Sequence, residues 1–448
     1  MLIQDFEIHP IFRTLSTSVS GDYLRELALV KRFCEIYRGD DTFRAGWHSH
    51  PEAALDSAGL ALPHEQLWPL VDSQAPGPLA PAVSRYLAFQ QEKLAWREQL
   101  RSQMRLTSPG LDAWRGRQIQ RCAWQLAAGN AEAIFHPPAA FELARGCSVG
   151  CWFCGVSAPK LADLWPASPE NRRLWKETLE VVFEFCGPAA AHSFLYWATD
   201  PLDNPDYEQF CLDFHAVFGQ FPQTTTALAG RDPERTRKLL RLSQAHGCLL
   251  NRFSLSSKRQ LRQVHEKFSP EELLRVELIL QNKESLGALS AAGKALSRID
   301  PSRAHATTIA CVSGFLFNMC EGRVRWVTPY PSGPQYPDGY KVEAEAHFES
   351  AAQLREVLAG WCALPARLPS GAVPRWREDL TATLEADAFR VHDSQRGVRF
   401  DRSWHPQAPE LAALIGEKSV GELALQLAAP AAETVLALQR LYQAGLFA

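Results

Sequence analysis

The chain has 448 residues, of which 46% are hydrophobic and 22% charged, and its formal net charge is -3. This composition is typical of a globular protein and excludes a disordered or fibrous chain, and the near-neutral charge gives no indication of a nucleic-acid partner. The N-terminus has no basic stretch followed by an apolar run, and no segment reaches the ~18 apolar residues of a membrane span. We therefore expect a cytoplasmic protein with no membrane partner, divided into about two to four domains.

Helical periodicity characterises residues 1–138. Apolar and aromatic side chains recur on one helical face over residues 23–37. Stretches rich in proline or glycine interrupt the pattern at residues 72–81 and again at 136–141, and we place a domain boundary at the second. These residues predict a helical N-terminal region without a cluster of catalytic side chains.

Short apolar segments alternate with amphipathic segments from Phe141 onwards. The expected strands are residues 141–145, 192–199, 223–229, 248–256, 305–312 and 324–328. The expected helices are residues 171–186, 205–218, 233–247 and 268–282, the last with a capping box at Ser269 and Glu272. This alternation predicts parallel strands joined by right-handed crossovers, in a doubly wound sheet or a barrel. Six such strands are too few to close an eight-stranded barrel.

The C-terminal region, residues 346–448, has a different pattern. Two short strand candidates within residues 389–400 flank a turn at 394–397, and two helix candidates follow, the first with a capping box at Ser419 and Glu422. This order predicts a small winged-helix-like module from about residue 385 to the C-terminus. A pair of helices that simply covers the core is the alternative.

Three cysteines lie within eight positions after the first expected strand. Cys147, Cys151 and Cys154 have the spacing C-x3-C-x2-C, and thiolates are the usual ligands of zinc and of iron–sulfur clusters. A structural zinc site needs four ligands, and no second Cys or His pair occurs nearby at finger-like spacing. A four-iron cluster held by three thiolates leaves one iron open to another ligand. Zinc with a distant fourth ligand such as His192, or a chance grouping of buried cysteines, remains an alternative.

This loop, with Phe153 before the third cysteine, resembles the signature loop of the radical S-adenosylmethionine (radical SAM) enzymes. In that superfamily a partial (β/α)6 barrel holds a [4Fe-4S] cluster whose open iron binds the amino and carboxylate groups of SAM. An electron from the cluster cleaves SAM to methionine and a 5′-deoxyadenosyl radical, which abstracts a hydrogen atom from the substrate. The resemblance implies this α/β fold over residues 139–345, both cofactors, and an external electron donor such as flavodoxin or ferredoxin.

The same resemblance implies a set of SAM contacts. Thr199 and Asp200 end the second expected strand, where the superfamily usually has a Gly-Gly-Glu-like turn that binds the SAM amino group, although this chain lacks those glycines. Arg252 and Ser254 end the fourth, where polar side chains of the superfamily reach the carboxylate and ribose of SAM. Phe153, with Trp152, is expected to shape the loop around the nucleoside. These residues also have simpler interpretations. Asp200 could belong only to a turn that starts a helix, and Arg252 could form only a surface ion pair.

Five sequence segments narrow the resemblance. ELARGCSVGCWFCGVSA, YWATDPLDNPDY and CVSGFLFN with RVRWVTPYP and YPDGY are similar to the proteusin-type radical SAM peptide epimerases. Those enzymes convert L-residues of a ribosomally made precursor peptide into D-residues, so a leader-plus-core precursor is the implied partner. There are two alternatives. The first is a radical SAM enzyme that makes another peptide modification, C-methylation or crosslinking; the second is a noncatalytic iron–sulfur or zinc protein that binds peptide. The widely spaced remaining cysteines argue against an auxiliary cluster, and the helical N-terminus against a cobalamin domain.

An epimerase also needs a hydrogen-atom donor on the second face of the substrate carbon. A thiol suits this role because its sulfur is polarizable and its S–H bond weak. We rank Cys311 first, because it lies in the fifth expected strand, and Cys320 second, because it lies in an expected turn. Either the helical N-terminal region or the winged-helix-like module is expected to bind the leader peptide.

Overall fold

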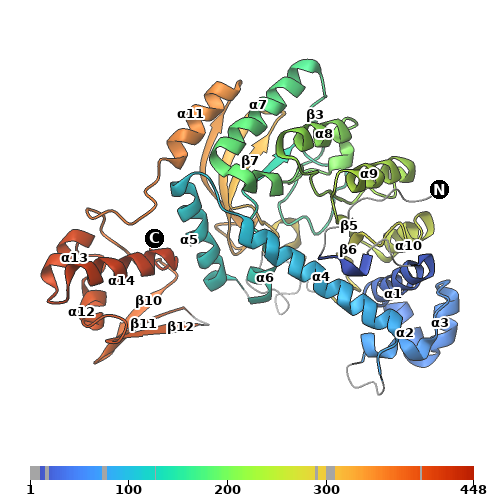
Figure 1. Ribbon diagram of the computed structural model, residues 1–448, viewed down its shortest axis with the longest axis horizontal. Coiled ribbons are helices and arrows are strands. Elements are labelled where there is room, and N and C mark those ends of the chain that lie inside the picture. Colours follow the sequence, from blue (N-terminus) through green and yellow to red (C-terminus); the bar gives the residue numbers. More distant parts are fainter. Residues whose placement is uncertain are drawn as a thin grey trace.

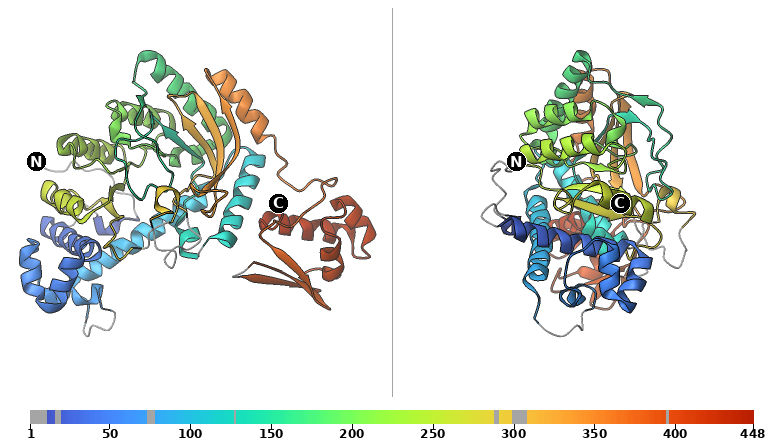
Figure 2. Two further views of the ribbon diagram at one scale, coloured as in Figure 1. Left: turned by 180° about the vertical axis from the view of Figure 1, so that it is seen from behind. Right: turned by 90° about the vertical axis from the view of Figure 1, so that its right-hand side faces the viewer.

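The computed structural model describes residues 11–15, 20–72, 78–126, 128–287, 291–298, 308–393 and 396–448 (Figure 1). The fold is a mixed α/β arrangement with helices around several sheets, and a smaller module at the C-terminal end stands apart from the rest of the molecule (Figures 1 and 2). None of the described helices combines the length and the apolar character that crossing a membrane requires.

Helices make up the N-terminal part of the chain. The helix α1 starts at the N-cap Ser20, whose hydroxyl accepts from the backbone of Tyr23, and Asp40 caps the next helix in the same way. The long helix α4 runs from the α1–α3 group towards α5 and passes the central strands (Figure 1). The elements are η1 (Arg13–Leu15), α1 (Gly21–Gly39), α2 (Asp41–Ser49), α3 (Pro51–Ser57), η2 (His64–Gln66), η3 (Trp68–Leu70), α4 (Pro81–Gln103), α5 (Pro109–Gln125) and α6 (Ala128–Ala133).

Two sheets form the centre of the molecule. The first has the order β1-β7-β8-β9, with β1 parallel to β7 and the other pairs antiparallel. The second is parallel with the order β4-β5-β6, and a parallel bridge from Ala140 to Phe194 extends the first sheet in its direction. The strands are β1 (Ala139–Glu142), β4 (Thr225–Thr226), β5 (Asn251–Leu255), β6 (Val276–Leu280), β7 (Gly314–Asn318), β8 (Arg323–Pro329) and β9 (Tyr340–His347), and a short pair is β2 (Ala144–Arg145) with β3 (Asp163–Leu164).

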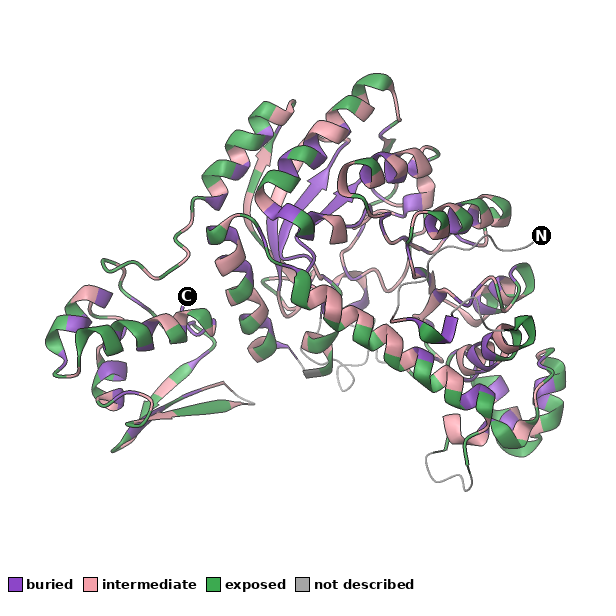
Figure 3. Ribbon diagram, in the orientation of Figure 1, coloured by how far each residue is buried: buried purple, intermediate pink, exposed green. Residues whose placement is uncertain are grey.

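The outer face of these strands is buried under helices. Phe141 points outwards from β1, stacks on Phe317 of β7 at 4.8 Å between ring centroids, and meets the ring of Trp175 edge-on at 4.9 Å. Large apolar side chains of this kind supply most of the packing energy of a core, and every residue of β1 and β7 is buried, at the centre of the molecule in Figure 3. The helices of this region are α7 (Pro169–Cys186), η4 (Gly187–His192), α8 (Tyr207–Phe218), α9 (Pro233–Ala245), α10 (Lys258–Lys267) and α11 (Ala351–Cys362), and the short turns η5 (Pro201–Asp203) and η6 (Gly293–Ala295) lie against the segment that carries Ser148 and Cys154.

The helices expected at residues 171–186, 205–218 and 233–247 are confirmed as α7, α8 and α9. The helix expected at 268–282 is wrong. Ser269 and Glu272 do exchange capping hydrogen bonds, but the chain only turns there and then forms β6, which pairs with β5 along its whole length.

The expected series of parallel strands is also partly wrong. Residues 192–199 contribute a single bridge at Phe194, residues 308–312 form no strand, and the strand predicted at 324–328 lies in β8, antiparallel to β7. Residues 305–307 lie outside the described residues. Within the described part of the chain, hydrogen-bonded ladders therefore join the strands into separate sheets and not into one continuous barrel.

The C-terminal module has its own core. Its antiparallel sheet packs against three helices around buried side chains such as Phe389, Leu411 and Leu438, so the helices do not simply cover the central core. The capping box of Ser419 and Glu422 is confirmed, and the turn expected at 394–397 lies partly outside the described residues. The elements are β10 (Thr381–Leu384), β11 (Ala388–His392), β12 (Gly397–Asp401), α12 (Ala408–Leu414), α13 (Val420–Gln426) and α14 (Ala431–Gln443), so the sheet begins before residue 385.

Candidate active site

The cysteine loop, residues 146–160, follows β1 and β2 and folds back on itself. Gly146 has a φ of +87°, and a Cβ atom there would lie 2.3 Å from the carbonyl oxygen of Lys160, so only glycine fits. The backbone N–H of Cys147 donates to Pro159 at 3.0 Å, and Leu161 donates back to Cys147 at 3.2 Å. The two ends of the loop are therefore tied together, and the three cysteines lie inside one closed turn of chain.

The three thiols are half-buried, and backbone N–H groups are directed at two of them. Val149 donates to Sγ of Cys147 at 3.5 Å, and Ala158 donates to Sγ of Cys154 at 3.2 Å. Burial raises the pKa of Cys147 to about 11, and burial together with the neighbouring thiols raises that of Cys151 to about 12. Hydrogen bonds of this kind stabilise thiolate ligands, and a cationic metal centre would offset the cost of ionising the thiols.

Three cysteines on one loop match the thiolate ligands that iron–sulfur clusters use. Among the described residues, no group of three or more His, Cys, Asp or Glu side chains is arranged to hold one metal ion. In a four-iron cluster each thiolate binds a different iron, so the sulfurs of Cys147, Cys151 and Cys154 need not converge on one point. His192 does not support the zinc alternative, because it lies beside Phe135 at the opposite end of the strands, in the same cavity as Cys311.

The turn over residues 199–203 packs against the cysteine loop. The carboxylate of Asp203 accepts from the backbone N–H of Ser148 at 2.8 Å and from its hydroxyl. The negative charges of Asp200 and then Asp203 also contribute to the raised pKa of Cys147, after burial. Thr199 has a buried hydroxyl that forms no hydrogen bond within the described residues. This turn is therefore next to the cysteines.

Asp200 itself is occupied by protein donors. Its buried carboxylate accepts from the hydroxyl of Thr226 at 2.7 Å and from the backbone N–H groups of Ala227 and Leu202, at 2.7 and 3.0 Å. Burial raises its pKa to about 6 despite these hydrogen bonds. Asp200 caps η5 and clamps this turn to the end of β4, so both the helix-initiating role and a wider structural role are present.

The two cysteines predicted as hydrogen donors lie at opposite ends of the sheet. Because β1 is parallel to β7, with Glu142 opposite Asn318, Cys320 follows β7 at the same end as the cysteine loop. Cys320 packs against the outer core, and burial and then Asp163 raise its pKa to about 12. Cys311 precedes β7 and lies at the other end. Because it is not in a strand, strand alternation does not determine its orientation, contrary to the prediction.

A cavity of about 490 Å³ lies between α4 and the N-terminal ends of the strands. Cys311 and Arg252 both line it, whereas Phe153, Thr199, Asp200 and Ser254 do not. The predicted site is therefore divided: Thr199 and Asp200 lie at the cysteine end, and Arg252 lies with Cys311. The contribution of α4 had no signal in the sequence beyond helical periodicity. Most of the cavity wall is apolar, including Leu94, Trp96, Leu100, Phe135, Phe194, Phe221, Leu249 and Leu250.

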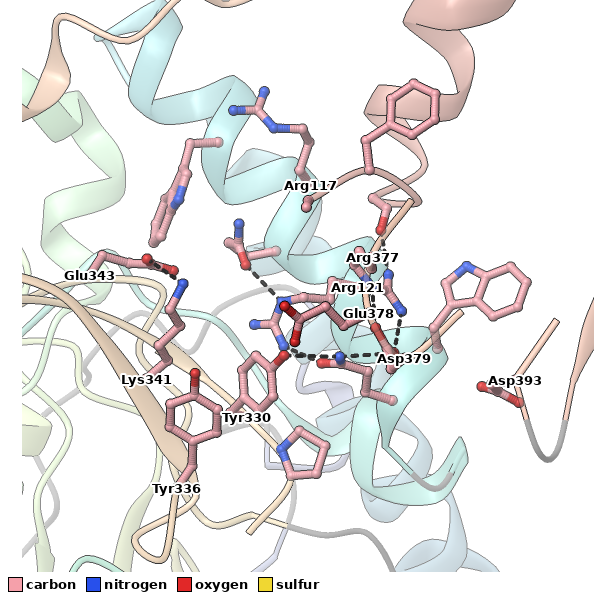
Figure 4. A pocket seen from close by; sticks show the side chains of 18 of the residues that line it. Arg117, Arg121, Tyr330, Tyr336, Lys341, Glu343, Arg377, Glu378, Asp379 and Asp393 are labelled. Carbon is pink, nitrogen blue, oxygen red and sulfur yellow. Dashed lines mark hydrogen bonds and ion pairs between the residues drawn. The ribbon is translucent and has the colours of Figure 1, made fainter. Parts of the chain in front are cut away.

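A second, larger cleft of about 1030 Å³ lies where the C-terminal module meets α5 and the chain after β8 (Figure 4). The rings of Tyr330 and Tyr336 pack together at 4.3 Å, and the guanidinium of Arg121 lies over Tyr330 at 4.4 Å. Arg117 lies over the ring of Tyr442, and its Nη1 is buried without a hydrogen-bond partner in the described part of the chain. Aromatic rings and charged groups alternate on these walls, a composition common in protein and peptide interfaces.

Comparisons with known proteins place the chain in a family but not in a functional class. No family model matches it. It is 39% identical over 360 residues to a Sinorhizobium fredii (strain NBRC 101917 / NGR234) protein named "Uncharacterized protein y4wI", an alignment that covers 75% of this chain and 69% of that protein. The crystal structure of BtrN in complex with AdoMet and 2-DOIA is similar over 42% of this chain and 72% of that chain, with 15% identity and a TM-score of 0.30, which does not show a shared fold. The chain belongs to the same family as the y4wI protein of S. fredii.

Proposed function

We propose that this protein is a radical SAM enzyme that converts L-residues of a ribosomally made precursor peptide into D-residues. The cysteine loop carries this proposal. Cys147, Cys151 and Cys154 lie in one closed loop after the first strand, and backbone N–H groups are directed at two of their sulfurs. These three residues would hold a [4Fe-4S] cluster, which together with SAM supplies a carbon-centred radical that can remove a hydrogen atom from a substrate.

The residues around the loop have separate roles in this proposal. The unpartnered hydroxyl of Thr199 and the side chain of Ser254, at the end of β5, are the polar groups we assign to SAM. Asp200 positions the turn that carries Thr199, because its carboxylate is already bonded to three donors. Phe153 lies edge-on to Trp152 at 5.6 Å and forms the apolar wall of the loop.

Cys311 is the residue that returns the hydrogen atom. Burial raises the pKa of this thiol to about 12, although Arg252 opposes the effect, so the sulfur carries its proton at neutral pH. The thiol lines the cavity at the opposite end of the strands from the cysteine loop, so in this proposal the substrate peptide must reach from one end of the strands to the other. The thiyl radical left on Cys311 is then reduced by one electron from an external donor such as flavodoxin or ferredoxin, and the resulting thiolate takes up one proton from solvent. Cys320, packed on the outer core, is the weaker candidate.

The cleft of Figure 4 is the place we assign to the leader of the precursor peptide. Substituting Tyr336→Ala removes half of the Tyr330–Tyr336 ring pair, and we expect precursor affinity to fall roughly tenfold. Leu425→Ala, on the exposed surface of α13 and outside the cleft, is the matched control. If both variants bound the precursor peptide as tightly as the parent protein does, the leader would not bind in this cleft.

The test of the proposed reaction is processing of the precursor peptide in D2O, followed by chiral amino-acid analysis and mass spectrometry. Because a thiol exchanges its proton with solvent, each inverted residue should carry one deuterium at Cα. The Cys311→Ala variant should still cleave SAM but form no D-residues, whereas Cys320→Ala should epimerise normally. If the Cys311→Ala variant epimerised normally, the hydrogen-atom donor would be another residue. A product that gains a methyl group or loses two hydrogens would identify one of the other radical SAM modifications.

A further inference from the structure

The cavity that contains Cys311 is apolar over most of its wall but carries a few ionised groups. Burial lowers the pKa of His192 to about 4, so this ring is neutral at pH 7, as is the Cys311 thiol. The charged side chains on the wall are Lys93, Arg97, Glu277 and Arg252. Three cations face one carboxylate, so the charge of the wall depends on how these four groups are paired.

Two of the cations are already paired. The ammonium of Lys93 lies 2.6 Å from the carboxylate of Glu277, and Arg97 pairs with Glu98 at 3.2 Å. Burial alone would raise the pKa of Glu277, but the charges of Lys93 and then Lys31 outweigh it and keep the carboxylate ionised. Each of these cations therefore has a carboxylate partner within the protein.

Arg252 is the exception. The ladder between β5 and β6 places it directly opposite Glu277, the neighbour with which it would be expected to pair. The carboxylate of Glu277 pairs with Lys93 instead. The guanidinium of Arg252 forms no ion pair or hydrogen bond among the described residues. Arg252 is a solvent-exposed residue at the wall of this largely apolar cavity, so its guanidinium presents planar donors without a counter-ion in the protein, and a carboxylate is the group that matches such a fork.

We infer that this cavity binds an apolar group that carries a carboxylate, with the carboxylate on Arg252. The inference rests on the proposed function in taking the cavity as the substrate site. The matching substrate chemistry is an apolar residue with a free α-carboxylate: either the C-terminal residue of a peptide or a small free acid. A volume of about 490 Å³ lies in the range that accommodates small organic ligands.

The test is isothermal titration of the full chain, free of cofactors, with two pairs of probes. The first pair is N-acetyl-L-phenylalanine and its amide, and the second is a pentapeptide ending in phenylalanine with a free or an amidated C-terminus. Within each pair only the carboxylate differs. We expect the acid to bind roughly 10- to 100-fold more tightly than the amide, as a charge-assisted bidentate contact implies.

Arg252→Gln should bind acid and amide equally, and Arg252→Lys should keep part of the preference, which separates loss of charge from loss of folding. Arg259→Gln, an exposed arginine on α10, should bind as the parent protein does. A peptide acid that binds at least as tightly as the small acid assigns the cavity to a peptide terminus; a peptide acid that binds much more weakly than the small acid assigns it to a free acid. Amides that bind as tightly as acids, or a preference that survives in Arg252→Gln, would overturn the inference.

Because the probes need neither cluster nor SAM, a Cys147→Ser variant should bind them unchanged, and failure of the epimerase test would leave this result intact.

Discussion

Replacement of Asp200 by alanine tests whether this residue is a structural clamp. The substitution leaves three donors without an acceptor: the buried hydroxyl of Thr226 and the half-buried N–H groups of Ala227 and Leu202. At about 1 kcal/mol for each orphaned donor, the free energy of unfolding should fall by about 3 kcal/mol. Urea denaturation followed by tryptophan fluorescence measures this difference, with the exposed Asp56→Ala as the matched control.

The pH dependence of this effect follows from the raised pKa of Asp200. Its folded-state pKa of about 6 lies above the ordinary value of 3.8, so the native state binds the proton more tightly than the unfolded chain. Protonated Asp200 therefore stabilises the folded protein. This contribution to the free energy of unfolding is fully present below pH 3.8, the pKa of the unfolded chain, and is lost as the pH rises through 6. By linkage, the parent protein should gain about 1.4 kcal/mol from this group between pH 7.5 and pH 5, and the alanine variant should not. The loss caused by the substitution is therefore larger at pH 5. A variant that unfolds like the parent and only loses SAM affinity would refute the clamp and make Asp200 a SAM ligand.

Three further predictions concern the core, the loop and the cavity. Phe141→Ala should lower the free energy of unfolding by about 3–5 kcal/mol, because its ring stacks on Phe317; a loss below about 1 kcal/mol in urea denaturation would contradict this packing. Gly146→Ala places a Cβ against the carbonyl of Lys160, so reconstituted protein should retain little iron, and full iron content would show that the loop does not need this glycine. Cys311 should react with iodoacetamide at pH 8 roughly 1000-fold more slowly than free cysteine, as its raised pKa implies; mass spectrometry of the alkylated peptide checks this, and a rate near that of free cysteine would place the thiol in solvent.

The sequence was most informative where a signal is local. The helices α7 and α9 each begin with Ser or Asp followed by proline in the first turn, and this pattern predicts a helix start without tertiary information. The segment 276–280 was misassigned because its continuous apolar run fits a buried strand or a helix equally well, and only its pairing with β5 decides. The outcome at this segment depends on contacts that are distant in sequence.

In the candidate site too, features that depend on neighbouring residues could be predicted, and features that depend on distant contacts could not. The spacing of Cys147, Cys151 and Cys154 identifies the loop by itself, because the three ligands are adjacent in the chain. The clamp at Asp200 depends on donors more than twenty residues away at β4, and the free guanidinium of Arg252 depends on a lysine from α4 that takes its expected partner. Neither arrangement has a signature in the local sequence.

The measurement that tests the central claim most directly is the metal content and electron paramagnetic resonance spectrum of the anaerobically reconstituted full chain. We predict a reduced [4Fe-4S] signal that shifts on addition of SAM, because three cysteines leave one iron for this ligand. Serine at Cys147, Cys151 or Cys154 should abolish the signal, whereas serine at the buried Cys186, outside the loop, should not. Bound zinc without iron, or a cluster signal that SAM leaves unchanged, would contradict the account.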